Sequence, residues 1–253
     1  MNPLLKVEDL HVSVGGRRVL RGVSLKINRG ETHVLMGPNA SGKTTLVLTL
    51  VGYPQYRITR GRILFEGRDI SDLEINERVR MGIGVAFQRP PSIRGVRLGD
   101  LLRLIVSLRA PDGSEGPHER FVDGILERLG MDPTFYRGRH VNVGFSGGEI
   151  KKCEVAQVLA LRPKLMIFDE PDSGVDIDSL RLVGEAINAA TEEFGAASLI
   201  ITHYRHILRY LKPDVVHVLH DGRIISSGEP GWILERLERL GYEGYAKSLI
   251  GGS

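Results

Sequence analysis

Residues 37–44 read GPNASGKT and match the phosphate-binding loop pattern G-x-x-x-x-G-K-[S/T]. The glycines of such a loop let successive backbone N–H groups point at phosphate oxygens, and the helix that follows adds its positive end. An apolar run at 34–36 precedes the loop, and a helix-like run follows it. We therefore predict a nucleoside triphosphate site, with Lys43 at the β- and γ-phosphates and Thr44 at Mg²⁺. The residues predicted to line it are Gly37, Pro38, Asn39, Ala40, Ser41, Gly42, Lys43, Thr44 and Thr45.

A second chemical signal is the acid pair Asp169 and Glu170, which ends an apolar run at 165–168. Asp169 suits the Mg²⁺ shell, and Glu170 suits a general base that positions the attacking water. The alternative is that an acid pair at a strand end has only a structural role and caps a turn. The phosphate loop upstream favours the catalytic interpretation.

A third signal is the turn Ser146, Gly147 and Gly148, which stands at the start of a predicted helix over 150–161. A serine and two glycines at a helix start form a second anion-binding N-terminus. A chain with one phosphate loop has no obvious use of its own for a second anion-binding helix start. The economical interpretation is that this turn serves the nucleotide of another copy.

Four short apolar runs must position these side chains, and each stops at a polar residue or the loop. Residues 34–36 stop at the phosphate loop, 83–87 at Gln88, 165–168 at Asp169, and 198–202 at His203. Continuous apolar strands are typical of a parallel sheet covered on both faces. Ligands of such sheets bind beyond the carboxyl ends of the strands, so the four polar stops should converge.

Other segments predict the elements around this sheet. The first thirty residues and 62–65 favour antiparallel strands, and 215–225 a hairpin. Helices are predicted over 98–108, 119–129 and 230–240, with a loop at 110–114. A capping box from Ser71 to Glu74 predicts a short helix that ends near Met81.

Composition bounds the function classes. The chain has 253 residues, 42% of them hydrophobic, with a net charge of +3 and no long basic run. A mild, dispersed charge does not favour nucleic-acid binding. The single cysteine, Cys153, excludes an intrachain disulfide or a cysteine-cluster metal site. No signal peptide or membrane span is predicted, so we expect a cytoplasmic protein without direct membrane insertion.

In order and spacing, these motifs resemble those of ATP-binding cassette (ABC) ATPases over nearly the whole chain. Residues 37–44 are similar to Walker A, 146–149 to the signature, 169–170 to Walker B and 173–176 to the D-loop. Gln88 is similar to the Q-loop glutamine and His203 to the switch histidine. The resemblance implies an α/β ABC-ATPase fold: a RecA-like P-loop core, an N-terminal antiparallel β subdomain and an inserted helical subdomain. The expected boundaries are one domain over 1–253, with core residues 1–89 and 162–253 and helical residues 90–161.

The resemblance also implies a Mg²⁺-dependent ATPase with ATP as its nucleotide. Two copies would pair head to tail in the ATP state. Its expected site residues fall into three roles. Those expected in catalysis are Glu170, His203, Lys43 and Gln88; those at Mg²⁺ are Thr44, Gln88 and Asp169; and those at the partner copy's nucleotide are Ser146, Gly147, Gly148 and Asp176.

Several stretches are similar to one branch, the SufC ATPases of iron–sulfur cluster assembly. They are residues 10–14, 141–149, 172–178, 202–204 and 212–219. That resemblance implies partners of the SufB and SufD type, which we expect to bind around Gln88 and the helix from Leu98. Departures from the transporter pattern are Val14 at the adenine-stacking position, the signature FSGGE and Tyr204 after the switch histidine. Pro171 departs from the SufC branch instead.

Three alternative functions would also use a phosphate loop. The energy subunit of a membrane importer would have the same fold, and the SufC-like stretches argue against it. A nucleic-acid-linked ABC ATPase would need long insertions or a second cassette. A P-loop kinase or GTPase would have no use for the turn at 146–148.

Two further hypotheses concern the helix after the signature. Element lengths place Glu170 near Lys151 or Lys152, so an ion pair there could restrain Glu170 at rest; solvated lysines are the alternative. Cys153 lies in the same helix, and we interpret it as an incidental thiol and not as a cluster ligand.

Overall fold

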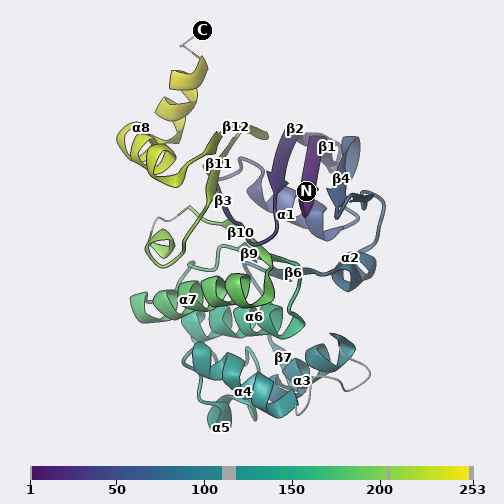
Figure 1. Cartoon of the computed structure of the whole chain (residues 1–253), viewed down its shortest axis with the longest axis vertical. Helices are drawn as coiled ribbons and strands as arrows, with labels where there is room; N and C mark the ends of the chain where they lie inside the picture. The colour runs from purple at the N-terminus through teal and green to yellow at the C-terminus, as the bar shows by residue number, and fades with distance from the viewer. Residues whose placement is uncertain (1, 110–117, 204–205, 251–253) are drawn as a thin grey trace.

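The computed structural model describes residues 2–109, 118–203 and 206–250 (Figure 1). Its first unit is an antiparallel sheet in the order β2-β1-β4-β5. These strands are β1 (Leu5–Val14), β2 (Arg17–Ile27), β4 (Arg57–Phe65) and β5 (Arg68–Asp69). Gly15 and Gly16 join β1 to β2 with φ of 55° and 79°, the positive values that a tight hairpin needs. The antiparallel strands predicted for the start of the chain are therefore confirmed.

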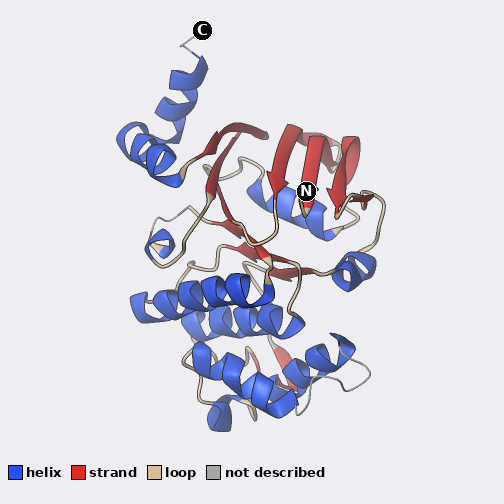
Figure 2. Cartoon of the chain, in the orientation of Figure 1, coloured by secondary structure: helices blue, strands red, loops and turns tan. Residues whose placement is uncertain are grey.

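A six-stranded sheet in the order β12-β11-β3-β10-β9-β6 forms the centre of the molecule (Figure 2). Its strands are β3 (Thr32–Met36), β6 (Ile83–Ala86), β9 (Leu165–Asp169), β10 (Ala197–Ile201), β11 (Val215–His220) and β12 (Arg223–Gly228). All neighbours are parallel except the hairpin of β11 and β12. The four strands predicted from apolar runs thus lie in one parallel sheet.

Every residue of β3, β9 and β10 is buried, because both faces of the sheet are covered. Val34 and Met36 face one hydrophobic core, while Leu35 between them faces the other. The first core packs α3, α4, α6, α7 and α8 against the sheet, and the second holds α1 and the antiparallel sheet (Figure 1). This alternation explains why the strands are apolar throughout.

The helices are α1 (Lys43–Val51), α2 (Ile75–Met81), α3 (Leu98–Arg109), α4 (His118–Arg128), α5 (Pro133–Tyr136), α6 (Gly147–Leu161), α7 (Ile177–Phe194) and α8 (Pro230–Ile250). A 3-10 turn, η1 (Ile207–Arg209), and a small two-stranded antiparallel sheet of β7 (Ile93–Arg97) and β8 (His140–Val141) complete the described elements. Helices α3 to α6 follow one another between β6 and β9, and we propose residues 90–161 as a helical subdomain.

Two sequence-based predictions differ from the structure. The capping box of α2 is made by Glu74 and Glu77, so the helix begins at Ile75 and the predicted box from Ser71 to Glu74 is wrong. Ser71 instead accepts a hydrogen bond from Ile63 N–H and bonds Asp69. The last helix continues to Ile250 across a kink at Gly241. The predicted loop at 110–114 lies outside the described residues.

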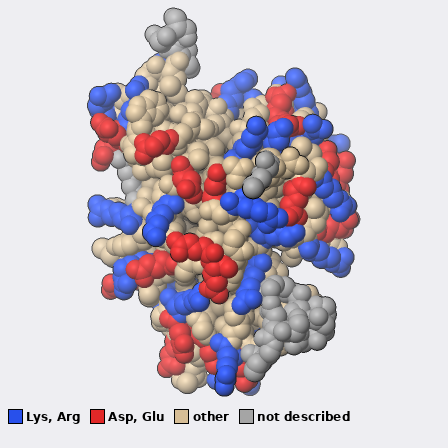
Figure 3. Space-filling view, viewed as in Figure 1, with Lys and Arg blue, Asp and Glu red and all other residues tan. Residues whose placement is uncertain are grey.

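Charged side chains of both signs are interspersed on the face shown in Figure 3. On the antiparallel sheet, Arg60 pairs with Asp9 and Arg62 with Glu8. Within the described ranges, no helix has the length and apolar character needed to cross a bilayer.

Candidate functional site at the carboxyl ends of the core strands

The central parallel strands end in register. Ile201 of β10 pairs with Asp169 of β9 and with Leu35 of β3, while Ala86 of β6 pairs with Phe168. The chain then leaves these strands toward Gly37, Gln88, Glu170 and His203. The structure therefore brings the phosphate loop, Gln88, the acid pair and His203 to one edge of the sheet.

The phosphate loop is fixed by glycine at two close approaches. A Cβ on Gly37 would lie 2.1 Å from the carbonyl oxygen of Leu219, so no larger residue fits there. Gly42 has a φ of 109° and precedes the first residue of α1. Ala40 also has a positive φ, 61°, within the curled loop. Thr44 and Thr45 lie in the first turn of α1, with Thr44 exposed.

Lys43 folds back into its own loop. Its Nζ donates to the carbonyl oxygens of Gly37 (2.9 Å) and Pro38 (2.8 Å), and the side chain is 5% exposed. Burial lowers the pKa of this ammonium, and the charges of Glu170 and Asp169 oppose that shift. The Oγ atom of Ser41 is buried close by and has no hydrogen-bond partner among the described residues. An ammonium that holds only carbonyl oxygens and an orphaned hydroxyl fit a phosphate ligand.

Asp169 and Glu170 are both buried at the end of β9. Burial and the adjacent Glu170 raise the pKa of Asp169, Lys151 and Lys43 oppose the rise, and the net value is about 6. Oδ1 of Asp169 has no hydrogen-bond partner among the described residues. A buried, unsatisfied carboxylate oxygen next to a phosphate loop fits a Mg²⁺ ligand.

Glu170 joins three strand ends. Its carboxylate accepts from Nε2 of Gln88 and pairs with Nε2 of His203, while its N–H donates to the carbonyl of Ile201 at 2.9 Å. Its φ of 52° is unusual for a residue with a side chain. The proposed general base is thus held by the two polar residues that follow the neighbouring strands.

Glu170 acts electrostatically on Lys151, as the predicted proximity requires, but among the described residues it forms no ion pair with Lys151 or Lys152, so that part of the hypothesis is wrong. Nζ of Lys151 donates to the carbonyl oxygen of Gln88 at 2.8 Å, and the carboxylate of Glu170 is taken by Gln88 and His203. The lengths of a helix and a strand bring two residues near each other, but they do not determine which of several nearby acceptors a long side chain bonds.

The turn before α6 is a complete helix cap. Ser146 is the N-cap residue: its side chain accepts from Glu149 N–H, and its own N–H donates to the Glu149 carboxylate at 2.6 Å. The hydroxyl of Tyr136 also donates to Glu149. Arg139 lies over the ring of Phe145, 4.6 Å from its centroid. The glutamate of the signature FSGGE therefore has a structural role.

The D-loop packs against the signature turn of the same chain. A Cβ on Gly147 would lie 2.7 Å from the carbonyl oxygen of Gly174, and one on Gly148 would lie 3.1 Å from Asp176 Oδ2. Asp176 caps α7 by accepting from Ser179 N–H at 2.9 Å. These predicted residues form a second group, separate from the phosphate loop. Helices α1 and α6 pack on opposite faces of the core sheet.

Sequence reasoning missed several supporting residues. Asp172 is buried and accepts from the Thr202 hydroxyl at 2.5 Å, which links the D-loop to the residue before His203. Tyr136 was missed because its contact with Glu149 joins distant segments. The Ser146–Glu149 spacing is a capping-box pattern that could have found the role of Glu149. Tyr204 lies outside the described residues.

Cys153 is buried within α6, and burial raises the pKa of its thiol to about 12. A thiol in that state is a poor metal ligand or nucleophile, since the thiolate is the reactive form.

Comparisons with known proteins agree with this geometry. A family model described as ABC transporter matches residues 20–173. The chain is 43% identical to "Vegetative protein 296" of Bacillus subtilis (strain 168), over 94% of this chain and 92% of that protein. It is 44% identical to a "Probable ATP-dependent transporter" of Synechocystis sp., over 95% and 94%. A "Probable ABC transporter ATP-binding protein" of Streptococcus pyogenes serotype M3 is 41% identical over 97% and 96%.

Solved structures share the fold. An ATP-binding cassette of an ABC transporter in its ADP conformation matches with a TM-score of 0.76 and 25% identity over 100% of both chains. The ATP-binding subunit of another ABC transporter gives 0.78 and 27% over 95% of each chain. A dimeric bacterial ABC transporter cassette gives 0.76 over 89% of this chain and 98% of that one; at 21% identity this likeness shows the fold alone. The predicted fold class is confirmed.

Proposed function

This chain belongs to the ABC transporter family as an ATP-hydrolysing subunit that binds ATP with Mg²⁺, and from that premise we propose that its hydrolysis drives iron–sulfur cluster assembly. In this proposal two copies pair head to tail in the ATP state. Their closure remodels scaffold partners of the SufB and SufD type in the cytoplasm.

The observation that carries the dimer is the position of two anion-binding helix starts. Lys43 begins α1 on one face of the sheet, and Ser146 caps α6, which packs on the other face. One nucleotide on the phosphate loop leaves the signature turn of the same chain without a ligand. A second copy in the opposite orientation would give each turn a nucleotide to bind.

Bound ATP with Mg²⁺ supplies the phosphoryl group and the cation that neutralises its charge. Lys43 and the loop N–H groups would hold the phosphates, and Thr44, Asp169 and Gln88 would hold the cation. Glu170 would orient the attacking water and take its proton, with His203 beside it. In these roles the residues position the reacting groups and stabilise charge, which is most of what catalysis of phosphoryl transfer requires.

The residues that favour iron–sulfur assembly are the branch-specific stretches at 141–149, 172–178 and 212–219. Residues in two of these stretches make structural contacts. Glu149 completes the cap of the signature helix, and Asp172 accepts a hydrogen bond from Thr202. The alternative is the ATP-binding subunit of a membrane transporter. The names of the relatives in Synechocystis and Streptococcus pyogenes favour that alternative.

The experiment is a pull-down from native extract with the Glu170→Gln variant, which should retain Mg²⁺-ATP and hold the closed dimer. We expect soluble cluster-assembly scaffolds among the captured proteins, identified by mass spectrometry. The matched control carries Lys43→Ala as well, so it should bind nucleotide poorly and lose any capture that depends on the ATP state. Recovery of a membrane permease in place of scaffolds would overturn the proposed branch.

A further inference from the structure

Helix α6 holds the backbone of the Q-loop with two buried charged side chains. Lys151 and Glu154 are three residues apart, so they lie on the same face of α6. Lys151 is 5% exposed and Glu154 is 8% exposed. Neither belongs to the phosphate loop, the signature turn or the acid pair.

Their contacts fall on consecutive peptide groups of Phe87 and Gln88. Nζ of Lys151 donates to the carbonyl oxygen of Gln88 at 2.8 Å and to that of Phe87 at 3.5 Å. Oε2 of Glu154 accepts from Phe87 N–H at 3.4 Å, and its other oxygen accepts from Gln157 at 3.0 Å. The ammonium and the carboxylate therefore take the acceptors and the donor of the same short stretch of backbone.

The same stretch is held a second time, further along the Q-loop. Nδ2 of Asn142 donates to the carbonyl oxygen of Pro91 at 3.0 Å, and the Ser92 hydroxyl donates to the Asn142 carbonyl at 2.9 Å. A cavity of about 210 Å³ lies behind the loop, between Pro90, Glu154 and Asn142. The Q-loop thus has polar contacts to the helical segment at both of its ends, and these contacts hold its backbone on either side of the pocket.

We propose that Lys151 and Glu154 are positioning residues that set the Gln88 peptide and thereby the contact between the Gln88 side chain and Glu170. The inference rests on the proposed role of Gln88 at the site. Burying two charges is costly unless each is paired and hydrogen-bonded, and here the backbone supplies those bonds. Burial lowers the pKa of Lys151 and raises that of Glu154, and the charge of each residue opposes the shift of the other.

A mechanical consequence follows from where α6 begins. Ser146 caps the same helix one turn before Lys151. A displacement of α6 when its cap meets the nucleotide of a second copy would move the Q-loop with it. Gln88 would then shift against Glu170, which gives dimer closure a direct path to the proposed catalytic base.

The test combines hydrogen exchange with a double-mutant cycle. Lys151→Met and Glu154→Leu remove the two holds, Lys151→Arg and Glu154→Gln retain a donor and an acceptor, and Lys152→Met is the matched control on the same helix. We expect amide exchange over 86–92 to rise about tenfold in the first two variants, while α6 itself is unchanged. The retaining variants and the control should stay near wild type.

The cycle uses Gln88→Ala and the Mg²⁺ concentration for half-maximal ATPase activity. Lys151→Met should raise that concentration about 5- to 30-fold in the wild-type background and leave it unchanged when Gln88 is alanine. Equal effects in both backgrounds, or unchanged exchange over 86–92, would overturn the proposal. If Gln88→Ala alone changes nothing, the proposed role of Gln88 fails, and the exchange data still decide whether Lys151 and Glu154 hold the loop.

Discussion

Asp169 is the residue whose function and stability conflict most directly. Its carboxylate is 4% exposed, lies beside Glu170 and leaves Oδ1 without a partner in the described structure. Burial raises its pKa to about 6, above the unfolded value of 3.8. The folded chain therefore holds this proton more tightly than the unfolded chain, and the ionised form destabilises the fold by about 3 kcal/mol above pH 6.

We predict that Asp169→Asn stabilises the nucleotide-free chain by about 1–3 kcal/mol at pH 8, because it removes an unpaired buried charge. The gain should shrink as pH falls from 6 to 3.8, where the wild-type residue becomes protonated. Thermal unfolding in EDTA at pH 8 and pH 5 measures both effects. Mg²⁺-ATP should raise the melting temperature of the wild type far more than that of the variant. A variant less stable than wild type at pH 8 would contradict this account.

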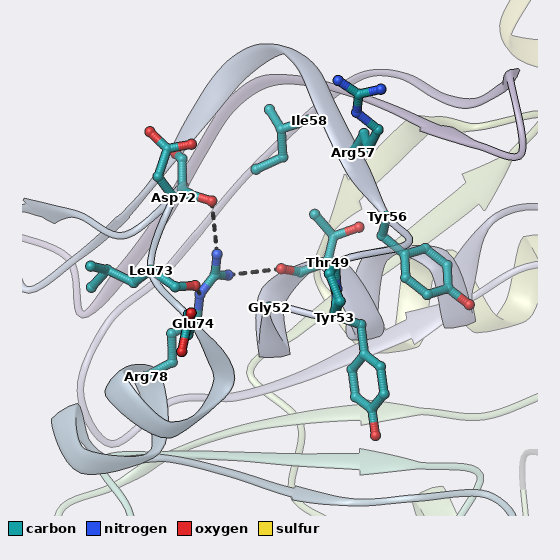
Figure 4. Close-up of a pocket in the computed structure, with 12 residues that line it drawn as sticks. Thr49, Gly52, Tyr53, Tyr56, Arg57, Ile58, Asp72, Leu73, Glu74 and Arg78 are labelled. Carbon is teal, nitrogen blue, oxygen red and sulfur yellow. Dashed lines mark hydrogen bonds between the residues drawn. The ribbon is translucent and has the colours of Figure 1, made fainter.

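At the scale of elements, Arg78 ties α2 to the end of α1. It is 2% exposed, and its guanidinium donates to the carbonyl oxygens of Thr49, Leu50, Ser71 and Leu73. Figure 4 shows Arg78 beside Thr49 and Leu73. Burial lowers its pKa to about 10, so it stays charged near neutral pH. A cation at the carboxyl end of α1 stabilises the helix that carries the phosphate loop.

Replacing this residue should therefore destabilise the fold. We expect Arg78→Met to reduce the free energy of unfolding by about 2–4 kcal/mol, since it leaves buried carbonyl groups unpaired. Urea unfolding followed by circular dichroism measures the loss. Arg80→Met is the control, because Arg80 is exposed on the same helix and should change stability little. Similar losses in both variants would remove the special role of Arg78.

A second element-scale feature joins β3 to β11. Nδ1 of His33 and Nε2 of His217 are 2.8 Å apart, and Ser227 and Glu31 contact the outer nitrogens of the pair. Burial, together with the neighbouring His33, lowers the pKa of His217 to about 4. The unfolded chain, with a pKa near 6.5, then binds the extra proton.

Stability supplied by neutral His217 should be complete above pH 6.5 and decline as pH falls from 6.5 to 4. The loss should reach about 3 kcal/mol, at about 1.4 kcal/mol per pKa unit. We predict that His217→Gln flattens the pH dependence of the unfolding midpoint across this window. His140→Gln, at an exposed position, is the control. An unchanged slope in His217→Gln would show that other groups carry the acid sensitivity.

The sequence predicts elements better than it predicts the contacts between them. Apolar runs identified β3, β6, β9 and β10, and the residues that follow these runs lie at one edge of the sheet, where we propose the site. The capping box of α2 was misplaced because Ser71 bonds β4 and Asp69 instead of a helix N–H. The partner of Lys151 was also wrong, since carbonyl oxygens of the Q-loop lie within reach of the same ammonium.

At the scale of the whole molecule, β7 presents an exposed surface next to the Q-loop. All five residues of β7 are exposed, including Ile93 at 37% and Val96 at 36%, and they follow the Q-loop directly. Apolar side chains flanked by Arg94 and Arg97 suit an apolar partner segment with acidic neighbours.

Charge reversal there should separate partner binding from nucleotide binding. Arg94→Glu or Arg97→Glu is expected to weaken capture of the scaffold partner about tenfold, since like charges would now meet acidic groups. The affinity for ATP should not change, because β7 lies outside the phosphate loop. A pull-down measures partner capture, and an ATP titration of the same preparations measures nucleotide affinity. Equal loss of both would assign Arg94 and Arg97 to folding and not to docking.

The proposed division of each site between two copies leads to a quantitative prediction. Lys43→Ala disables the phosphate loop of a chain and leaves its signature turn intact. Ser146→Asp keeps a good N-cap residue for α6 and places a negative charge where the partner's phosphate would bind. Each variant alone should be inactive, because every site of its homodimer contains the defect.

Mixing the two variants should restore activity. A mixed dimer contains one site with both changes and one with neither, and half of all dimers are mixed at equal concentrations. The mixture should therefore reach about one quarter of wild-type turnover if the two sites act independently. The double variant Lys43→Ala/Ser146→Asp mixed with either single variant is the control and should stay inactive, since no intact site can form. If equal mixtures remain inactive while both variants fold, either turnover requires two intact sites in the same dimer or the signature turn does not serve the partner's nucleotide. To separate these two outcomes, each variant is fused to a wild-type copy as a linked dimer. The number of nucleotides that each linked dimer retains is then measured.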